Sequence, residues 1–227
     1  ILVTGAGSNC VINTIKSLKS TGKYRVIATD IYPYSVGAFR SDIGYLVPKE
    51  QKDGLFISKL LEICKKENVD LLIPGFDTEI PYIFDAKERF ESLGVKVLIG
   101  NKLLIKISSD KSLLYEYLRS KGLPCLKSFE ISEKELAVKE LSLPLIIKPK
   151  SGWGQRGYSL INSHDEFNHV LTSLQGDLDN YMIQEYVNDQ EGEYTNSVSV
   201  ARDGDILGCI CMKRELVKGS SIKIEID

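Results

Sequence analysis

The amino-acid sequence predicts an α/β protein in which a doubly wound parallel sheet is followed by an incomplete α+β domain. Two observations support this fold class. Over the first hundred residues, short apolar runs alternate with helix-like stretches, whereas from Asn101 onward the runs are joined by glycine loops and by a hairpin signal. A chain of 227 residues is long enough for two modest domains. We therefore expect one domain over residues 1–100 and a second over residues 101–227.

The strands expected in the first domain are short and largely apolar, and they read "ILVT", "YRVIAT", "VDLLIP" and "VKVLIG". Helices are expected up to about Ser20, over the amphipathic run "DGLFISKLLEICKKEN", and near residues 78–92. Short apolar strands that are separated by helices indicate a parallel sheet covered on both faces. This pattern is the basis for the doubly wound sheet.

The second domain begins with the helix-like run "KISSDKSLLYEYLRSKG", for which Ser109 or Asp110 is the expected N-cap and Gly122 the stop. The elements expected after it are strand 126–130, helix 132–140, strand 144–148, a glycine loop, strand 157–161, helix 163–174 and strand 181–187. Two alternating runs then flank Asp203-Gly204-Asp205, which predicts a hairpin. This order is typical of a small α+β unit.

Charge and composition argue against several kinds of partner. The 29 basic and 31 acidic residues nearly cancel, so we expect no nucleic acid or other polyanion as a partner. No apolar run approaches the roughly 18 to 20 residues that span a bilayer, so we expect no membrane and a cytoplasmic location. The five cysteines, with no C-x-x-C pair, argue against a secreted disulfide framework, and two histidines give little support to a zinc site. Both ends lie inside strand-like runs, so we expect a piece of a longer protein.

The first glycine loop, in "ILVTGAGSNCVINTIKSLK", supplies only part of a dinucleotide fingerprint. Gly5 and Gly7 occupy the first two glycine positions of G-x-G-x-x-G, but Cys10 occupies the third. Asp30 ends the second expected strand, where a ribose-binding acid would lie in a dinucleotide fold. We favour a tight turn from strand to helix, and an NAD-dependent oxidoreductase is the less favoured alternative.

The second glycine loop, in "IIKPKSGWGQRGYSL" at residues 146–160, is longer than a hairpin requires. Its glycines and cations are Gly152, Gly154, Gly157, Lys148, Lys150 and Arg156. Glycines let backbone N–H groups approach an anion, and cations add charge-assisted contacts, so the loop suits a polyphosphate. It lacks G-x-x-x-x-G-K-[ST] and leads into a strand, which excludes a P-loop. A phosphate-covering lid is favoured over an exposed hairpin.

Three further groups of polar residues are candidates for the same ligand. Lys111 opens a helix, where its charge opposes the helix dipole unless an anion lies nearby. Gln184 and Glu185 close an apolar strand, and Glu193 follows in the next turn. A carboxylate can accept hydrogen bonds from two ribose hydroxyls, and strand backbone groups can bind an adenine edge. Taken singly, Lys111 and the acidic turn are typical of solvated surface.

Five short motifs occur in a recognisable order: D-K opens a helix, G-L-P follows it, K-P precedes the glycine loop, Q-E-Y closes a strand, and G-E-Y-T comes next. In this order they resemble the ATP-grasp superfamily. The first hundred residues resemble its Rossmann-like pre-ATP-grasp domain, and the closest similarity is to carbamoyl-phosphate synthase large-chain-like proteins. The resemblance covers essentially the whole chain. It implies a lid subdomain at about 123–183 and a truncated C-terminal subdomain at 184–227.

The resemblance also implies roles for individual residues. Lys111 and Lys148 match lysines that contact ATP phosphates, and the loop from Ser151 to Tyr158 matches the mobile lid. The remaining matches are Glu185, Tyr186 and Val187 at the adenine and Glu193 at the ribose, and Gln184 is a further nucleotide-binding candidate. Lys213 and Arg214 are expected to face the phosphates or the acceptor, with Lys148 and Arg214 as the catalytic candidates. No metal ligand is assigned, since the family's Mg²⁺ ligands are expected beyond residue 227.

The function implied by the resemblance is an ATP-dependent ligase. Such an enzyme activates a small-molecule carboxylate as an acyl phosphate, which an amine or similar nucleophile then attacks. ATP and Mg²⁺ are the expected cofactors, and a homodimer is the assembly considered. A non-catalytic nucleotide-binding module is the alternative, because the chain carries a nucleotide cradle without the metal ligands.

Overall fold

The computed structural model describes residues 1–152, 156–188, 192–201, 203–217 and 220–226. The chain divides into two compact units, Ile1–Lys106 and Ile107–Asp227, and each is described by itself. Within the described residues, no helix is both long enough and apolar enough to cross a membrane.

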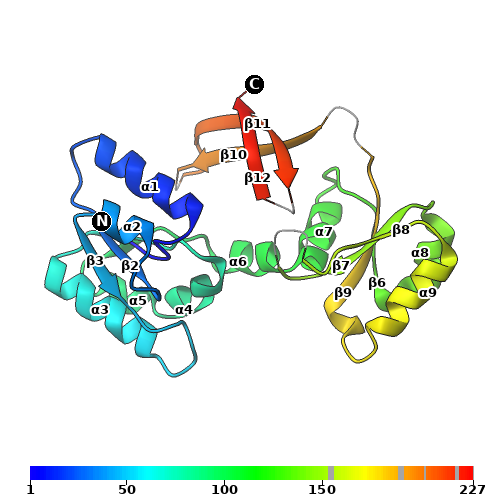
Figure 1. Cartoon of the computed structure of the whole chain (residues 1–227), viewed down its shortest axis with the longest axis horizontal. Helices are drawn as coiled ribbons and strands as arrows, with labels where there is room; N and C mark the ends of the chain where they lie inside the picture. Colours follow the sequence, from blue (N-terminus) through cyan, green and yellow to red (C-terminus); the bar gives the residue numbers. More distant parts are fainter. Residues whose placement is uncertain (153–155, 189–191, 202, 218–219, 227) are drawn as a thin grey trace. The chain divides into compact units, whose positions relative to one another are not determined.

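The first unit is built on a five-stranded parallel sheet of order β3-β2-β1-β4-β5 (Figure 1). Its strands are β1 (Leu2–Val3), β2 (Ile27–Asp30), β3 (Ile43–Leu46), β4 (Leu71–Ile73) and β5 (Lys96–Val97). The helical segments are α1 (Asn9–Ser20), α2 (Val36–Arg40), α3 (Leu55–Glu67), η1 (Asp77–Glu79), α4 (Ile80–Asp85) and α5 (Lys87–Glu91). The predicted parallel sheet is confirmed, while the helix expected near 78–92 is divided into three short segments.

Both faces of this sheet are covered, as the apolar strands predict. In β1, Leu2 packs in one core cluster with residues of α3, α4 and α5, whereas its neighbour Val3 packs in a second cluster with Val11 and Ile15 of α1. Successive strand residues point to opposite faces, so one two-residue strand contributes to both cores. From β1 the chain adds strands on one side of the sheet, and from β4 it adds them on the other side. The loops after β1 and β4 therefore lie next to each other at the carboxyl ends of these strands.

The second unit begins with α6 (Lys102–Ser109), whose first residues belong to the first unit, and α7 (Lys111–Ser120). Asp110 separates them, and its side chain accepts hydrogen bonds from the N–H groups of Ser112 and Leu113. This N-cap is the predicted one. The helix before it was not predicted, because "KISS" was assigned to the same helix as the residues after Asp110.

A four-stranded antiparallel sheet of order β6-β9-β7-β8 follows α7. Its strands are β6 (Ser128–Glu130), β7 (Leu145–Pro149), β8 (Ser159–Ile161) and β9 (Tyr181–Glu185). Its helical segments are η2 (Ile131–Glu133), α8 (Lys134–Glu140), α9 (His164–Ser173) and η3 (Leu178–Asn180). The predicted order of strands and helices is confirmed, and each strand end lies within two residues of the predicted one.

The two faces of this sheet differ in chemistry. Leu145, Ile147 and Ile183 form a buried cluster with residues of α8 and α9. The alternate positions carry Lys148 and Gln184 beside Ile146 and Met182, so the opposite face combines polar and apolar side chains. The face that carries Lys148 and Gln184 is therefore the one on which a polar ligand can lie.

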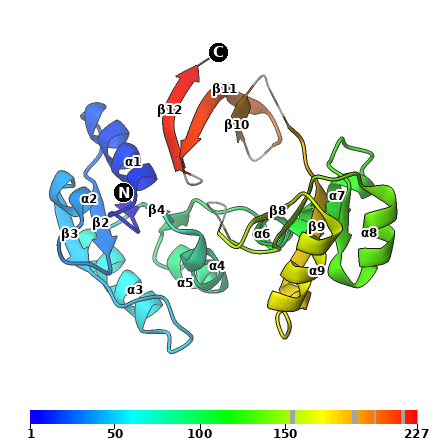
Figure 2. The ribbon, with the colours of Figure 1, turned by 45° about the vertical axis from the view of Figure 1, so that its right-hand side comes forward.

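The last strands form an antiparallel meander, β10 (Glu193–Val200), β11 (Ile206–Val217) and β12 (Ser220–Ile226), as Figure 2 shows. The loop between β10 and β11 contains Asp203 and Gly204, which confirms the predicted hairpin. Gly204 has a φ of 98°, the left-handed conformation that favours glycine in turns.

Candidate functional site

The start of α7 and the start of the second glycine loop are joined by several hydrogen bonds. The Lys111 backbone N–H donates to the Lys150 carbonyl at 2.8 Å, and its Nζ donates to the Gly152 carbonyl at 2.9 Å. Ser151 Oγ donates to the Ser109 carbonyl at 2.9 Å. Residues Lys111, Ser151 and Gly152, which the family resemblance assigns to phosphate binding, are therefore brought together.

Lys148 lies on the face of the sheet opposite the buried cluster, and within the described residues its ammonium contacts neutral groups. Its Nζ donates to Gln184 Oε1 at 2.6 Å, lies 3.5 Å from the Tyr115 hydroxyl, and stands 5.3 Å from the centre of the Tyr115 ring. Gln184 Nε2 in turn donates to Ser128 Oγ at 2.8 Å. The lysine is thus held between α7 and β9.

The electrostatics of Lys111 and Lys148 favour an anionic ligand. Burial lowers the pKa of both ammonium groups, and the positive charge of Lys148 lowers the pKa of Lys111 further. Among the ion pairs of the described residues, none involves either lysine. In contrast, Lys150 in the same loop pairs with Glu130. Two neighbouring cations without a carboxylate partner indicate a site for a polyphosphate.

The glycine loop itself needs glycine at both described ends. Gly152 has a φ of +116°, and Gly157 has a φ of +71°. A Cβ on Gly157 would also lie only 2.8 Å from the Pro149 ring. The predicted lid residue Gly154 lies outside the described residues, so only the two ends of the loop are placed.

The strand expected to bind adenine ends earlier than predicted. The last ladder pair of β9 is Glu185 with Leu145, so Tyr186 and Val187 lie beyond the sheet. Glu185 also bonds Lys127 twice, through its N–H to the Lys127 carbonyl at 3.0 Å and through Oε1 to the Lys127 N–H at 2.8 Å. The assignment of strand to residues 186 and 187 was wrong, because the partner strand offers no residue opposite them. Their backbone groups are left outside the ladder, where a ligand could bind them.

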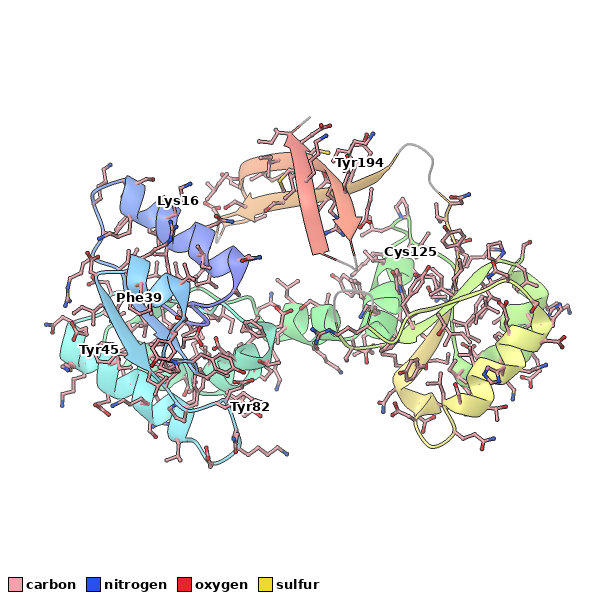
Figure 3. All side chains as sticks on the ribbon, in the orientation of Figure 1. Lys16, Phe39, Tyr45, Tyr82, Cys125 and Tyr194 are labelled. Carbon is pink, nitrogen blue, oxygen red and sulfur yellow. The ribbon has the colours of Figure 1, made fainter. Side chains whose placement is uncertain are left out.

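Glu193, Lys213 and Arg214 belong to the meander, and the register separates the two cations. Arg214 lies opposite Glu193, and its Nε donates to Glu193 Oε1 at 3.0 Å. Lys213 is the next residue along β11, so it points to the other face, where its Nζ lies 5.7 Å from the ring of Tyr194 (Figure 3). The sequence interpretation placed Lys213 and Arg214 at one site. The register instead directs their side chains to opposite faces of the meander.

Two residues of the second unit were missed by sequence reasoning. Tyr115 lies four residues after Lys111 on α7, a spacing that places both on one helix face and could have identified it. Ser128, by contrast, carries no local signal, because its contact with Gln184 joins residues far apart in the chain. Both side chains also line a cavity of 360 Å³ together with Met182.

The first glycine loop is occupied by the protein's own groups. Asp30 is buried; its Oδ2 accepts from the Gly7 N–H at 2.5 Å and its Oδ1 from the Tyr32 N–H at 2.8 Å. Both carboxylate oxygens are thus engaged by the chain, which disfavours the ribose-binding role. The Tyr-x-x-x-Lys spacing of a catalytic pair in an NAD-dependent oxidoreductase occurs at Tyr45–Lys49 and at Tyr117–Lys121. Tyr45 lies on β3 and donates to Glu67, so the first pair shares no helix face (Figure 3).

A buried carboxyl, Glu79, lies where the loops after β1 and β4 meet and was not predicted. Thr4 Oγ1 donates to Glu79 Oε2 and accepts from the Gly75 N–H at 2.9 Å. The pKa of Glu79 is raised to about 7, mainly by burial and to a lesser extent by the negative charges of Glu50 and Asp30, while the hydrogen bonds from Thr4 and Gly75 oppose the rise. The sequence "DTEIP" resembles an ordinary helix start, so nothing local signals this burial.

No group of three or more His, Cys, Asp or Glu side chains is arranged to hold a metal ion within the part of the chain that the structure describes. The candidate site of the described residues is thus a pair of cations beside a glycine loop.

Comparison with known proteins gives three kinds of similarity. A family model described as the PylC-like, N-terminal domain matches residues 1–98. The chain is 28% identical over 162 residues to the carbamoyl phosphate synthase large chain of Deinococcus radiodurans, covering 67% of this chain and 15% of that protein. It is 23% identical over 203 residues to the formate-dependent phosphoribosylglycinamide formyltransferase of Prochlorococcus marinus, covering 86% and 49%.

Among solved structures, the N5-carboxyaminoimidazole synthetase of Staphylococcus aureus, complexed with ADP, superposes with a TM-score of 0.74 at 14% identity. The match covers 98% of this chain and 56% of that one. The biotin carboxylase domain of the Hydrogenobacter thermophilus 2-oxoglutarate carboxylase gives a TM-score of 0.67 at 14% identity. The chain spans about half the length of these structures and less of the synthase large chains. Residues 1–98 therefore match the PylC-like N-terminal domain, the chain shares its fold with about half of the synthetase and carboxylase structures, and carbamoyl phosphate synthase large chains are distant relatives.

Proposed function

We propose that this chain is the ATP-binding part of a cytoplasmic ATP-dependent ligase that couples a carboxylate to an amine or a similar nucleophile. The observation that supports this function best is the pair of partly buried ammonium groups, Lys111 and Lys148, beside the second glycine loop. The similarity to carbamoyl phosphate synthase large chains and to ADP-bound structures supports the same nucleotide.

The reaction has two steps. A carboxylate oxygen of the substrate attacks the γ-phosphorus of ATP, the bond from that phosphorus to the β-phosphate oxygen breaks, and acyl phosphate and ADP form. The amine nitrogen then attacks the acyl carbon, phosphate leaves with the electron pair of the C–O bond, and the nitrogen releases a proton. Phosphoryl transfer requires mainly positioning and charge neutralisation, which Lys111 and Lys148 supply through their ammonium groups.

The residues that bind the adenine and the ribose are assigned from their positions in β9 and in the meander. The backbone of Tyr186 and Val187, outside the β9 ladder, binds the adenine edge, and Glu193 accepts the ribose hydroxyls. If Glu193 lines the nucleotide, Arg214 is the cation on the same face of the meander and Lys213 is not. Mg²⁺, when bound with the nucleotide, would supply further neutralisation of phosphate charge.

The test is direct measurement of nucleotide binding by calorimetry with ATP and ADP in the presence of Mg²⁺. We expect Lys148→Ala to weaken binding by about tenfold or more, because a charge-assisted contact is lost. Lys139→Ala is the matched control, since Lys139 is exposed on α8 behind the opposite face of the sheet. Equal affinity of Lys148→Ala and the unmodified chain would contradict the assignment.

Two further outcomes separate the alternatives. Trp153 is the only tryptophan and lies in the second glycine loop of the sequence, so its fluorescence is expected to respond to ATP with Mg²⁺ and not to NAD. ATP binding without ATP turnover in the full-length protein would favour a nucleotide-binding module over a ligase.

A further inference from the structure

Gln184 is the most deeply buried polar side chain of the candidate nucleotide site, with 2% of its surface exposed. Both ends of its amide are used. Oε1 accepts from Lys148 Nζ at 2.6 Å, and Nε2 donates to Ser128 Oγ at 2.8 Å. Ser128 Oγ donates onward to the Leu126 carbonyl at 3.1 Å. This chain of bonds fixes which way the amide points, because a flipped amide would present its N–H groups to the ammonium.

The amide uses its oxygen on Lys148 and one of its two N–H groups on Ser128, and burial leaves only 2% of Gln184 exposed to a nucleotide. The sequence interpretation placed it among the residues that contact the ligand, whereas its contacts here are with Lys148 and Ser128. Its effect on a nucleotide therefore passes through the lysine. The Tyr115 ring supports the same ammonium from α7, at 5.3 Å from the ring centre.

The groups that contact the Lys148 ammonium, the Gln184 amide and the Tyr115 side chain, are neutral, and this determines how much of the lysine charge is left for a ligand. An ammonium paired with a carboxylate is already neutralised, as Lys150 is by Glu130. An amide oxygen fixes the position of an ammonium without cancelling its charge. Lys148 is thus oriented by Gln184, while its charge and that of Lys111 stay available to an incoming anion.

We infer that Gln184 is a positioning residue that holds the Lys148 ammonium in place for a nucleotide phosphate through the relay Ser128, Gln184, Lys148. The inference rests on the proposed nucleotide site. It assigns to Gln184 no contact with the nucleotide, which distinguishes it from Lys148.

A double-mutant cycle separates this role from a structural one. Gln184→Met keeps the side-chain volume and removes the acceptor, and we expect it to weaken MgADP binding by about tenfold. In a Lys148→Met background, the same substitution is expected to change MgADP affinity by less than about twofold, because the lysine through which it acts is gone. An equal loss in both backgrounds would overturn the inference.

Gln184→Glu tests the neutrality. The variant keeps the acceptor oxygen but adds a negative charge, so we expect weaker MgADP binding at neutral pH. The titratable groups that face Lys148 are Tyr115 and Lys111 of α7, and the new carboxylate would hold the lysine proton to higher pH. The fall of binding at alkaline pH is therefore expected to move upward. MgADP affinity equal to that of the unmodified chain at all pH values would contradict the role of the neutral amide.

Ser128→Ala provides the milder variant of the series. It leaves the Lys148 contact intact and removes only the far support of the amide, so a loss of about two- to fivefold in MgADP affinity is expected. Failure of the unmodified chain to bind MgADP would count against the proposed function itself. Binding that depends on Lys148 but on neither Gln184 nor Ser128 would count against the relay alone.

Discussion

The two glycine loops of this protein look alike in sequence and differ in how their charges are used. In the first loop the carboxylate of Asp30 is engaged by two backbone N–H groups of the same chain. In the second loop the ammonium groups of Lys111 and Lys148 contact carbonyl, amide and hydroxyl groups only, in the interactions of the described residues. Glycine content therefore does not identify a ligand site. A partly buried charge without an opposite charge beside it is a better indicator of a ligand site, because a ligand of opposite charge can offset the free-energy cost of burying it.

The largest expected effect concerns the carboxylate of the first loop. Asp30→Ala removes a buried carboxylate and leaves the N–H groups of Gly7 and Tyr32 without their acceptor. We expect the free energy of unfolding to fall by about 3 kcal/mol, measured by chemical denaturation. Asp85→Ala, at an exposed position of α4, is the control and is expected to change it by less than about 0.5 kcal/mol. Similar values for both variants would mean that Asp30 is not a structural group.

The next effect concerns Glu79, the buried carboxyl that joins Thr4 and Gly75 beside the first loop. Burial raises its pKa from the usual 4.5 to about 7, so between these values the folded state keeps a proton that the unfolded chain has released. The free energy of unfolding should therefore fall as pH rises through this window, by about 3 kcal/mol in total, and level off above it.

Glu79→Gln supplies the control for this pH dependence. The amide cannot titrate but keeps an acceptor for the Thr4 hydroxyl, so the slope between pH 4.5 and 7 is expected to disappear. Denaturation curves measured at several pH values would check it. An unchanged slope in the variant would assign the pH dependence to other groups.

The contrast between the loops also marks what the sequence could and could not predict. Hydrophobic alternation is local, so the parallel sheet, the hairpin and the Asp110 cap followed from short stretches. Lys111 and Lys148 followed from motifs in a recognisable order. The end of β9 depends on where β7 stops offering partners, and the burial of Glu79 and of Gln184 depends on contacts with distant segments. Such properties arise from tertiary packing and leave no local pattern.

The smallest expected effect sharpens the comparison most. Lys111→Ala should change the free energy of unfolding of the ligand-free chain by no more than about 1 kcal/mol, because the lost bonds to carbonyls are offset by relief of its repulsion with Lys148. The effect of Lys111→Ala on the free energy of unfolding should become measurable when ADP is present. A concentration a hundred times the Kd of the unmodified chain stabilises that chain by about 2.7 kcal/mol, and a tenfold weaker variant gains only about 1.4 kcal/mol.

Asp30→Ala is expected to show the reverse behaviour, with a lower stability in the absence of ADP and the full increment in its presence. Denaturation curves with and without MgADP measure both quantities on each variant. The difference arises because the charge of Asp30 is used in folding, whereas that of Lys111 is kept for a ligand. A Lys111→Ala chain that lost several kcal/mol without ADP would make its ammonium a structural group like Asp30, and the two loops would then no longer differ in kind.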